Sequence, residues 1–173
     1  KLRLLRKEKT GTKVPASLRS HLLNRHGMQD VGEHMSVPGV RKLSCAELQA
    51  FLDERCREPG IADCDREELD AAAACSIAVL THGSAEHLQQ AAEEALSPVP
   101  GLYSTGAFPC VIMVIRMSVN VKMHDFNAAV DRVEATVRDL AGEGGIRSFL
   151  MLASVEEEDG DAVVDIILTD SAA

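Results

Sequence analysis

The clearest pattern of apolar and polar positions runs from residue 111 to residue 123. From Ile115 onward every second residue is apolar, and the residues between them are polar or charged. The apolar positions are Met117, Val119, Val121 and Met123, and the polar ones are Arg116, Ser118, Asn120 and Lys122. This period of two predicts a strand with one buried and one solvated face. The preceding stretch Val111–Val114 is apolar throughout, so we expect it to be covered on both faces.

A helix is predicted directly after this strand. Asp125 stands at its N-cap position, and Gly142 follows its last turn. Apolar residues recur between them at helical spacing and form one stripe: Phe126, Val130, Val133, Val137 and Leu140. We expect this stripe to lie across the inner face of the neighbouring strands.

Two more strands are predicted at the end of the chain, Ser148–Val155 and Ala162–Thr169. The Asp159-Gly160 pair between them favours a hairpin, because glycine readily adopts the positive φ that such turns require. The glutamates beside it indicate a solvated turn, because a site for a hard cation needs carboxylates that converge. Residues 101–173 are therefore predicted to be the sheet domain of an α+β protein. Its antiparallel sheet and packed helix follow the order strand–helix–strand–strand, as in ferredoxin-like folds.

Residues 43–100 read as a helical region. Ser44 and Glu47 have the spacing of a capping box and start one helix. A second helix is predicted from Asp65 through the alanines 71–74 to Cys75. The sequence leaves two alternatives for the residues that follow: the helix continues to Leu80, or residues 76–81 form a short strand. A third helix is predicted over residues 84–96, before two prolines.

Charge is distributed unevenly along the 173 residues, whose net charge is −9. Residues 1–42 carry a balance of +7 and the rest a balance of −16. This indicates a basic extended arm on an acidic body, which binds RNA, an acidic protein or an anionic lipid, or is a solvated tail without a specific role. The candidate partner-binding residues of the arm are Arg3, Arg6, Lys7, Lys9, Lys13, Arg19 and Arg25. No apolar run is long enough to cross a bilayer, so no transmembrane segment is predicted.

The cysteines have a regular spacing. Cys45 and Cys56 are eleven residues apart, and so are Cys64 and Cys75, which puts each pair on one side of a helix. If the two helices fold antiparallel, Cys56 faces Cys64 and Cys45 faces Cys75, and two disulfides can close the hairpin. The alternative is four small buried thiols. Cys110, the odd cysteine, is expected to be a buried or free thiol.

Two C-x10-C segments in succession resemble the coiled-coil–helix–coiled-coil–helix proteins of the mitochondrial intermembrane space. The resemblance covers the segment from Cys45 to Cys75. It implies a disulfide-linked helical hairpin and a mitochondrial location, with the plastid and the cytoplasm as alternatives.

A second resemblance concerns the sheet domain. His124-Asp125-Phe126-Asn127-Ala128-Ala129, with Val164–Thr169 and Leu43–Glu47, is similar to segments of the pterin-4a-carbinolamine dehydratases. This family is α+β, with a saddle-shaped sheet that associates edge to edge. Its catalytic His-His-Pro is replaced here by Gly144-Gly145-Ile146-Arg147, which implies a catalytically inactive relative. An active relative would depend on His124, Asp125, Tyr103 and Asp170.

The catalytic motifs of other enzyme classes are absent. The sequence has no Walker loop, no G-x-G-x-x-G and no H-E-x-x-H, and we predict no catalytic residue, cofactor or metal. The favoured function is a non-catalytic accessory subunit of a larger, organellar multiprotein complex that acts through protein–protein contacts. The alternatives are a small dehydratase-like enzyme with an atypical active site, and an organellar ribosomal protein that uses its basic arm on RNA.

Overall fold

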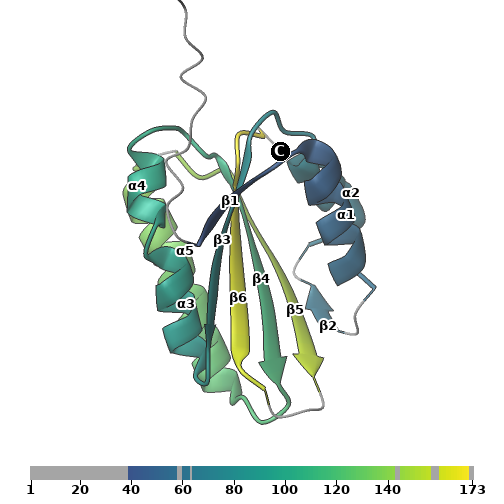
Figure 1. Ribbon diagram of the computed structural model, residues 1–173, viewed down its shortest axis with the longest axis vertical. Helices are drawn as coiled ribbons and strands as arrows, with labels where there is room; N and C mark the ends of the chain where they lie inside the picture. Colours follow the sequence, from purple (N-terminus) through teal and green to yellow (C-terminus); the bar gives the residue numbers. More distant parts are fainter. Residues whose placement is uncertain (1–38, 58–59, 63, 143–144, 157–159, 172–173) are drawn as a thin grey trace, which may run out of the picture. The chain divides into compact units, whose positions relative to one another are not determined.

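A mixed sheet forms the central layer of the protein (Figure 1). The computed structural model describes residues 39–57, 60–62, 64–142, 145–156 and 160–171. Within these residues the sheet has six strands in the order β1-β3-β6-β4-β5-β2. The strands are β1 (Val40–Leu43), β2 (Gly60–Ala62), β3 (Ala78–Ala85), β4 (Cys110–Ser118), β5 (Ser148–Glu156) and β6 (Ala162–Thr169). The α+β class is thereby confirmed.

Helices cover both faces of the sheet (Figure 1). The first face carries α3 (Leu88–Leu96), α4 (Val99–Tyr103) and α5 (Met123–Ala141), and we name it the α3–α5 face. The second carries α1 (Cys45–Arg55) and α2 (Arg66–Ala73), and we name it the α1–α2 face. In β4, Val111 and Met113 are buried on the first face, and Ile112 and Val114 on the second. The expected cover on both faces of this strand is confirmed.

The connection from β4 through α5 to β5 is a parallel crossover, since β4 and β5 pair in parallel from Cys110↔Ser148 to Ser118↔Glu156. β6 then pairs antiparallel with the other side of β4. The predicted hairpin of the last two strands is therefore wrong, because β4 lies between them. The turn signal correctly indicates that the chain reverses after β5. It does not show whether the next strand is the direct neighbour, because a connection of several residues also spans the roughly 10 Å to the strand beyond β4.

On the α3–α5 face, the backbones of α3 and β3 are in close contact where the helix crosses the strand. A Cβ atom on Gly83 would lie 2.0 Å from the carbonyl oxygen of Ala91. Ala91, Ala92 and Ala95 are fully buried, so small residues line both sides of this contact. In α5, Phe126, Val133 and Val137 are buried, and Val130 and Leu140 pack partly buried against the same core. The predicted stripe is confirmed.

The α1–α2 face is closed by two capped helices. Each helix has a capping box, the predicted one of Ser44 with Glu47 on α1 and a second one of Asp65 with Glu68 on α2. Hydrogen bonds to the backbone N–H and hydroxyl of Ser44, with Arg41 nearby, lower the pKa of Glu47 to about 2. Leu48 and Leu52 of α1 are buried against the sheet, as is Leu69 of α2.

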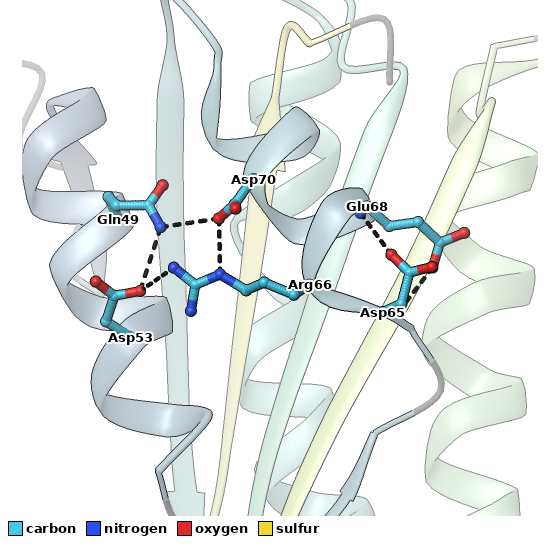
Figure 2. Close-up of polar contacts among 6 residues, drawn as sticks. All are labelled: Gln49, Asp53, Asp65, Arg66, Glu68 and Asp70. Atoms are coloured by element: carbon cyan, nitrogen blue, oxygen red, sulfur yellow. Dashed lines mark hydrogen bonds and ion pairs between the residues drawn. The ribbon is translucent and has the colours of Figure 1, made fainter.

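Polar side chains join α1 to α2 (Figure 2). The amide of Gln49 donates to Asp53 at 3.2 Å and to Asp70 at 3.1 Å. Arg66 donates to Asp70 through Nε at 2.9 Å and pairs with Asp53 through its guanidinium. The hydrogen bond from Arg66 holds the pKa of Asp53 below its ordinary value.

Several predicted boundaries are corrected by the structure. β4 ends at Ser118, so the alternation that continues to Met123 belongs to a turn and to the start of α5. Val119 and Met123 are exposed, and only Val121 packs partly against the core. Residues 78–85 are a strand, so the second helix does not continue to Leu80. The first residues of the predicted helix 84–96 belong to this strand, and α3 begins only at Leu88.

The helical region and the sheet domain share one sheet. β3 lies in the predicted helical region and pairs with β6 from Ala78↔Thr169 to Ala85↔Ala162. β1 pairs with β3 in turn, and the described residues all belong to one compact unit. The boundary expected at residue 100 therefore crosses a continuous sheet, and β1 begins inside the segment that was predicted to be an extended arm.

Candidate functional site

Three chain connections converge at one end of the sheet, which we name the loop end. β3, β4 and β5 finish there and β6 begins there. A hollow of about 690 Å³ lies between the β3–α3 connection, the β4–α5 connection and the start of β6. Its lining residues are Glu86, His87, Leu88, Gln89, Ser118, Asn120, Val121, Lys122, Asp125, Gly160 and Asp161.

Two helices begin at this hollow. The N-cap residues are His87 for α3 and Lys122 for α5, and neither makes a side-chain capping hydrogen bond. Asp125, predicted as the cap of α5, lies in its first turn instead. A carboxylate there interacts favourably with the positive end of the helix dipole.

Two large apolar side chains are exposed beside the hollow, Val119 at 62% and Met123 at 60%, and we name them the loop-end patch. They bracket Asn120, Val121 and Lys122, which line the hollow. The backbone N–H of Val119 donates to the carbonyl of Glu156 at 3.1 Å, so this turn is held against the end of β5. The patch is therefore presented by ordered backbone.

The charged side chains around the hollow are mostly acidic. Glu86, Asp125 and Asp161 line it, against Lys122. His124 is highly exposed, and its Nδ1 lies 3.3 Å from Oδ1 of Asp125. This arrangement suits a partner that presents an apolar group flanked by positive charge.

A second polar group lies on the α1–α2 face, where the cover of α1 and α2 ends. His82 of β3 and Asp165 of β6 are opposite one another in the register, and His82 Nδ1 is 2.8 Å from Asp165 Oδ1. The carboxylate is buried, with 6% of its side chain exposed, and the imidazole is half exposed. Arg116 of β4 and Ser154 of β5 are register partners further along this face. Nη1 of Arg116 is 3.8 Å from Oε1 of Glu156.

Sequence reasoning missed this polar group. Asp165 interrupts an otherwise apolar strand, and that interruption was the available signal. His82 lies between the segments predicted to form the second and third helices, and the pair forms only because β3 lies beside β6.

The four residues on which a dehydratase-like activity would depend are not brought together. His124 and Asp125 lie at the loop end. Asp170 is at the opposite end of the sheet, where its Oδ1 accepts hydrogen bonds from the backbone of Ser76 and Ile77 at 2.8 and 2.9 Å. The nine residues of β4 separate the two ends by about 30 Å.

Tyr103 also lies far from the loop end, in α4, before β4 begins. Its hydroxyl donates to the carbonyl of Phe108 at 3.2 Å, and the two rings meet edge to face. Burial raises the pKa of Tyr103 to about 12, so this hydroxyl is held protonated in a packing role.

All five cysteines lie in the described residues, and none of them forms a disulfide in the structure. The thiol of Cys64 lies 3.7 Å from the carbonyl of Met151 on β5, and Cys56 is exposed at the end of α1. Cys45 donates to the carbonyl of Cys75, so one of the two expected pairs is adjacent. Cys110 is fully buried in β4, as predicted, and burial raises the pKa of its thiol.

The basic residues of the predicted arm fall outside the described residues: Arg3, Arg6, Lys7, Lys9, Lys13, Arg19 and Arg25. Their role in binding RNA, protein or lipid stays a prediction. In the part of the chain that the structure describes, no helix combines the length and apolarity needed to cross a bilayer. No group of three metal-ligating side chains converges within those same residues.

Comparison with known proteins supports the fold. No protein-family model and no curated protein matches the sequence. A solved FtsZ dimer from M. jannaschii is similar, with a TM-score of 0.54 and 14% identity over 72% of this chain and 36% of that one. A mutant FtsZ from the same organism has a TM-score of 0.49, at 16% identity over 69% and 36% of the two chains. CetZ from Methanosaeta thermophila has a TM-score of 0.46, at 13% identity over 74% and 36%. The chain thus spans about a third of the length of these proteins, and at such identities the likeness concerns the fold alone.

Proposed function

We propose that this chain is a non-catalytic structural subunit that joins a larger protein assembly through its loop end. The observation that carries the proposal is the loop-end patch, where Val119 and Met123 stand in solvent beside an acidic hollow. Removing apolar surface from water when a partner covers it favours binding through the hydrophobic effect. The ordered turn that presents the patch reduces the entropy lost on binding.

The partner that suits this surface is a protein segment with an apolar anchor and flanking Lys or Arg side chains. The anchor would cover Val119 and Met123, and the cations would face Glu86, Asp125 and Asp161. We place the assembly in an organelle, the mitochondrion first, on the strength of the cysteine spacing alone.

The test starts with mild purification of the full chain from its native source and identification of the proteins that co-purify. The identified partner is then purified, and its affinity is measured for the wild type and for Val119→Asp and Met123→Asp. We expect each variant to weaken binding by about tenfold or more, with an unchanged melting temperature. Light scattering of the purified chain shows whether the partner is a second copy.

Ile77→Asp is the matched control, because Ile77 is also a large apolar residue, is 51% exposed, and lies at the opposite end of the sheet. It should leave the affinity unchanged. If both loop-end variants bind the partner as tightly as the wild type does, the loop end is not the docking surface.

The hollow supports one alternative, a small enzyme of the dehydratase type. Asp125 lines it, and His124 lies beside Asp125. Turnover of a pterin carbinolamine by the wild type and by His124→Ala separates the two functions. Equal background rates remove the enzyme, and a rate that is lost in His124→Ala removes the non-catalytic subunit.

A further inference from the structure

Cys45 and Cys75 are adjacent because of the backbone register of two strands. β1 pairs antiparallel with β3 from Val40↔Thr81 to Leu43↔Ala78. Continued by two residues, this register places Cys45 opposite residue 76. Cys45 is the first residue of α1, and its thiol donates a hydrogen bond to the carbonyl of Cys75. The pairing of an edge strand therefore holds the two residues together.

The two cysteines differ in accessibility. Cys45 is exposed, and Cys75 is buried with 7% of its surface exposed. Burial is the main cause that raises the pKa of the Cys75 thiol to about 11, and the neighbouring Cys45 and Asp170 raise it further. A soluble oxidant therefore meets Cys45 first, and Cys75 is positioned to react with the product.

The remaining cysteines do not share this arrangement. The thiol of Cys64 lies against the carbonyl of Met151, and Cys110 is enclosed in β4. Cys56 is exposed at the opposite end of α1 from Cys45. Of the two pairs that the sequence spacing suggests, Cys45 and Cys75 are the pair whose members are seen in contact.

We propose that Cys45 and Cys75 are a thiol modification site that closes to a reversible disulfide under a peroxide oxidant. The sulfur of Cys45 attacks the peroxide O–O bond, which gives the sulfenic acid of Cys45 and one water. The sulfur of Cys75 then attacks the sulfenic sulfur. The S–S bond forms, the S–O bond breaks, and the hydroxyl leaves with the thiol proton as a second water. The peroxide is reduced by two electrons, and the two thiols supply them.

The disulfide would fasten the start of α1 to the entry of β3, beside the edge strand β1. It links residues 30 positions apart, and a loop of that size restricts the unfolded chain considerably. Oxidation should therefore raise the melting temperature of the full chain by roughly 5–15 °C. A thiol reductant should reverse the rise.

The experiment treats the reduced full-length protein with hydrogen peroxide, blocks the remaining thiols with a maleimide and maps the peptides by mass spectrometry. We expect a linked peptide pair with Cys45 and Cys75, the melting temperature rise, and reversal of both by dithiothreitol. Cys56→Ser is the matched control, and it should form the same link. Cys45→Ser changes an exposed side chain, so the reduced variant should melt like the reduced wild type. Oxidation should not raise its melting temperature.

Three outcomes overturn the proposal. One is a Cys45 that stays open to the maleimide after peroxide treatment. Another is a Cys45 that proceeds to the sulfinic acid without a linked peptide. The third is a link between Cys56 and Cys64 in place of the expected one. None of these outcomes bears on the loop end, which contains no cysteine.

Discussion

The two faces of the sheet differ along the same strands. On the α3–α5 face, β6 presents Val164, Ile166 and Leu168, and the face stays apolar from one end of the strand to the other. On the α1–α2 face the same strand presents Ile167, and then Asp165 where the cover of α1 and α2 ends. The same change occurs in β4.

In β4, Ile115 and Met117 are buried on the α3–α5 face, whereas Arg116 lies on the other. One face is thus a continuous apolar core that determines which elements pack together. The other combines a smaller core with the titratable side chains and the thiols. Stability should therefore depend more steeply on the α3–α5 face, and chemistry should depend on the α1–α2 face and the loop end.

The largest effect on stability is expected at Gly83 on the α3–α5 face, where there is no room for a side chain. In Gly83→Ala the new methyl group would meet the backbone of Ala91 and Ala95, so α3 must move away from β3. We expect a loss of about 3 kcal/mol or more in the free energy of unfolding, measured by urea denaturation. Gly101→Ala is the control, because nothing lies within 4 Å of the added atom. A Gly83→Ala protein as stable as the wild type would show that this contact is not close-packed.

On the α1–α2 face, the largest effect is expected at the His82–Asp165 pair. His82→Ala leaves the buried carboxylate of Asp165 without its 2.8 Å partner. We expect a cost of about 1–2 kcal/mol. In the background of Asp165→Asn the same substitution should cost less, because no buried charge loses its partner. A double-mutant cycle by denaturant unfolding measures the difference, and strictly additive effects would mean that the two side chains do not interact.

Local signals in the sequence predicted the individual elements well. The stripe of α5, the capping box at Ser44, the start of α2 near Asp65 and the cover on both faces of β4 all follow from patterns within about twenty residues. The short edge strands were missed, because three or four residues are too few to show a period of two. The last residues of β3 were not predicted as strand, because Gly83 stands in place of a strand-forming residue where α3 comes close.

The arrangement of the elements and the candidate site depend on contacts between distant segments. His82 and Asp165 are 83 positions apart, and only the order of the strands brings them together. The hollow joins three connections whose sequences carry no shared motif. The regular spacing of the cysteines suggested two bridges. The contact between Cys45 and Cys75 depends on the pairing of β1 with β3, which the sequence did not predict, and the pairing of Cys56 with Cys64 stays a prediction.

A smaller effect, dependent on pH, is expected at the start of α1. The pKa of Glu47 is about 2 in the folded protein, against an ordinary value of 4.5, because Ser44 donates hydrogen bonds to the carboxylate. A lowered pKa means that the stabilisation is present above about pH 4.5 and is lost as the pH falls toward 2. Glu47→Gln should therefore lower the melting temperature at pH 7 and approach the wild type near pH 2.

The control for this comparison is Glu93→Gln, which makes the same change of charge at an exposed position of α3. Its difference from the wild type should vary less between pH 7 and pH 2. A Glu47→Gln profile parallel to that of Glu93→Gln would mean that the capping box does not hold the carboxylate ionised.

The smallest effect is expected in the polar bridge between α1 and α2. Arg66→Ala removes the contacts to Asp53 and Asp70 (Figure 2). Arg66 and Asp70 are half exposed, and Asp53 is partly exposed. Solvent screens such pairs, so the melting temperature should change only slightly and should change less still in high salt. Thermal melts at low and high ionic strength check this. Arg138→Ala, which breaks the exposed pair with Glu134 inside α5, is the matched control on the other face. A far larger fall in melting temperature for Arg66→Ala than for Arg138→Ala would mean that the α1–α2 layer depends on its polar bridge as much as on its small core. The two faces would then differ in the type of interaction that stabilises them as well as in the size of their cores.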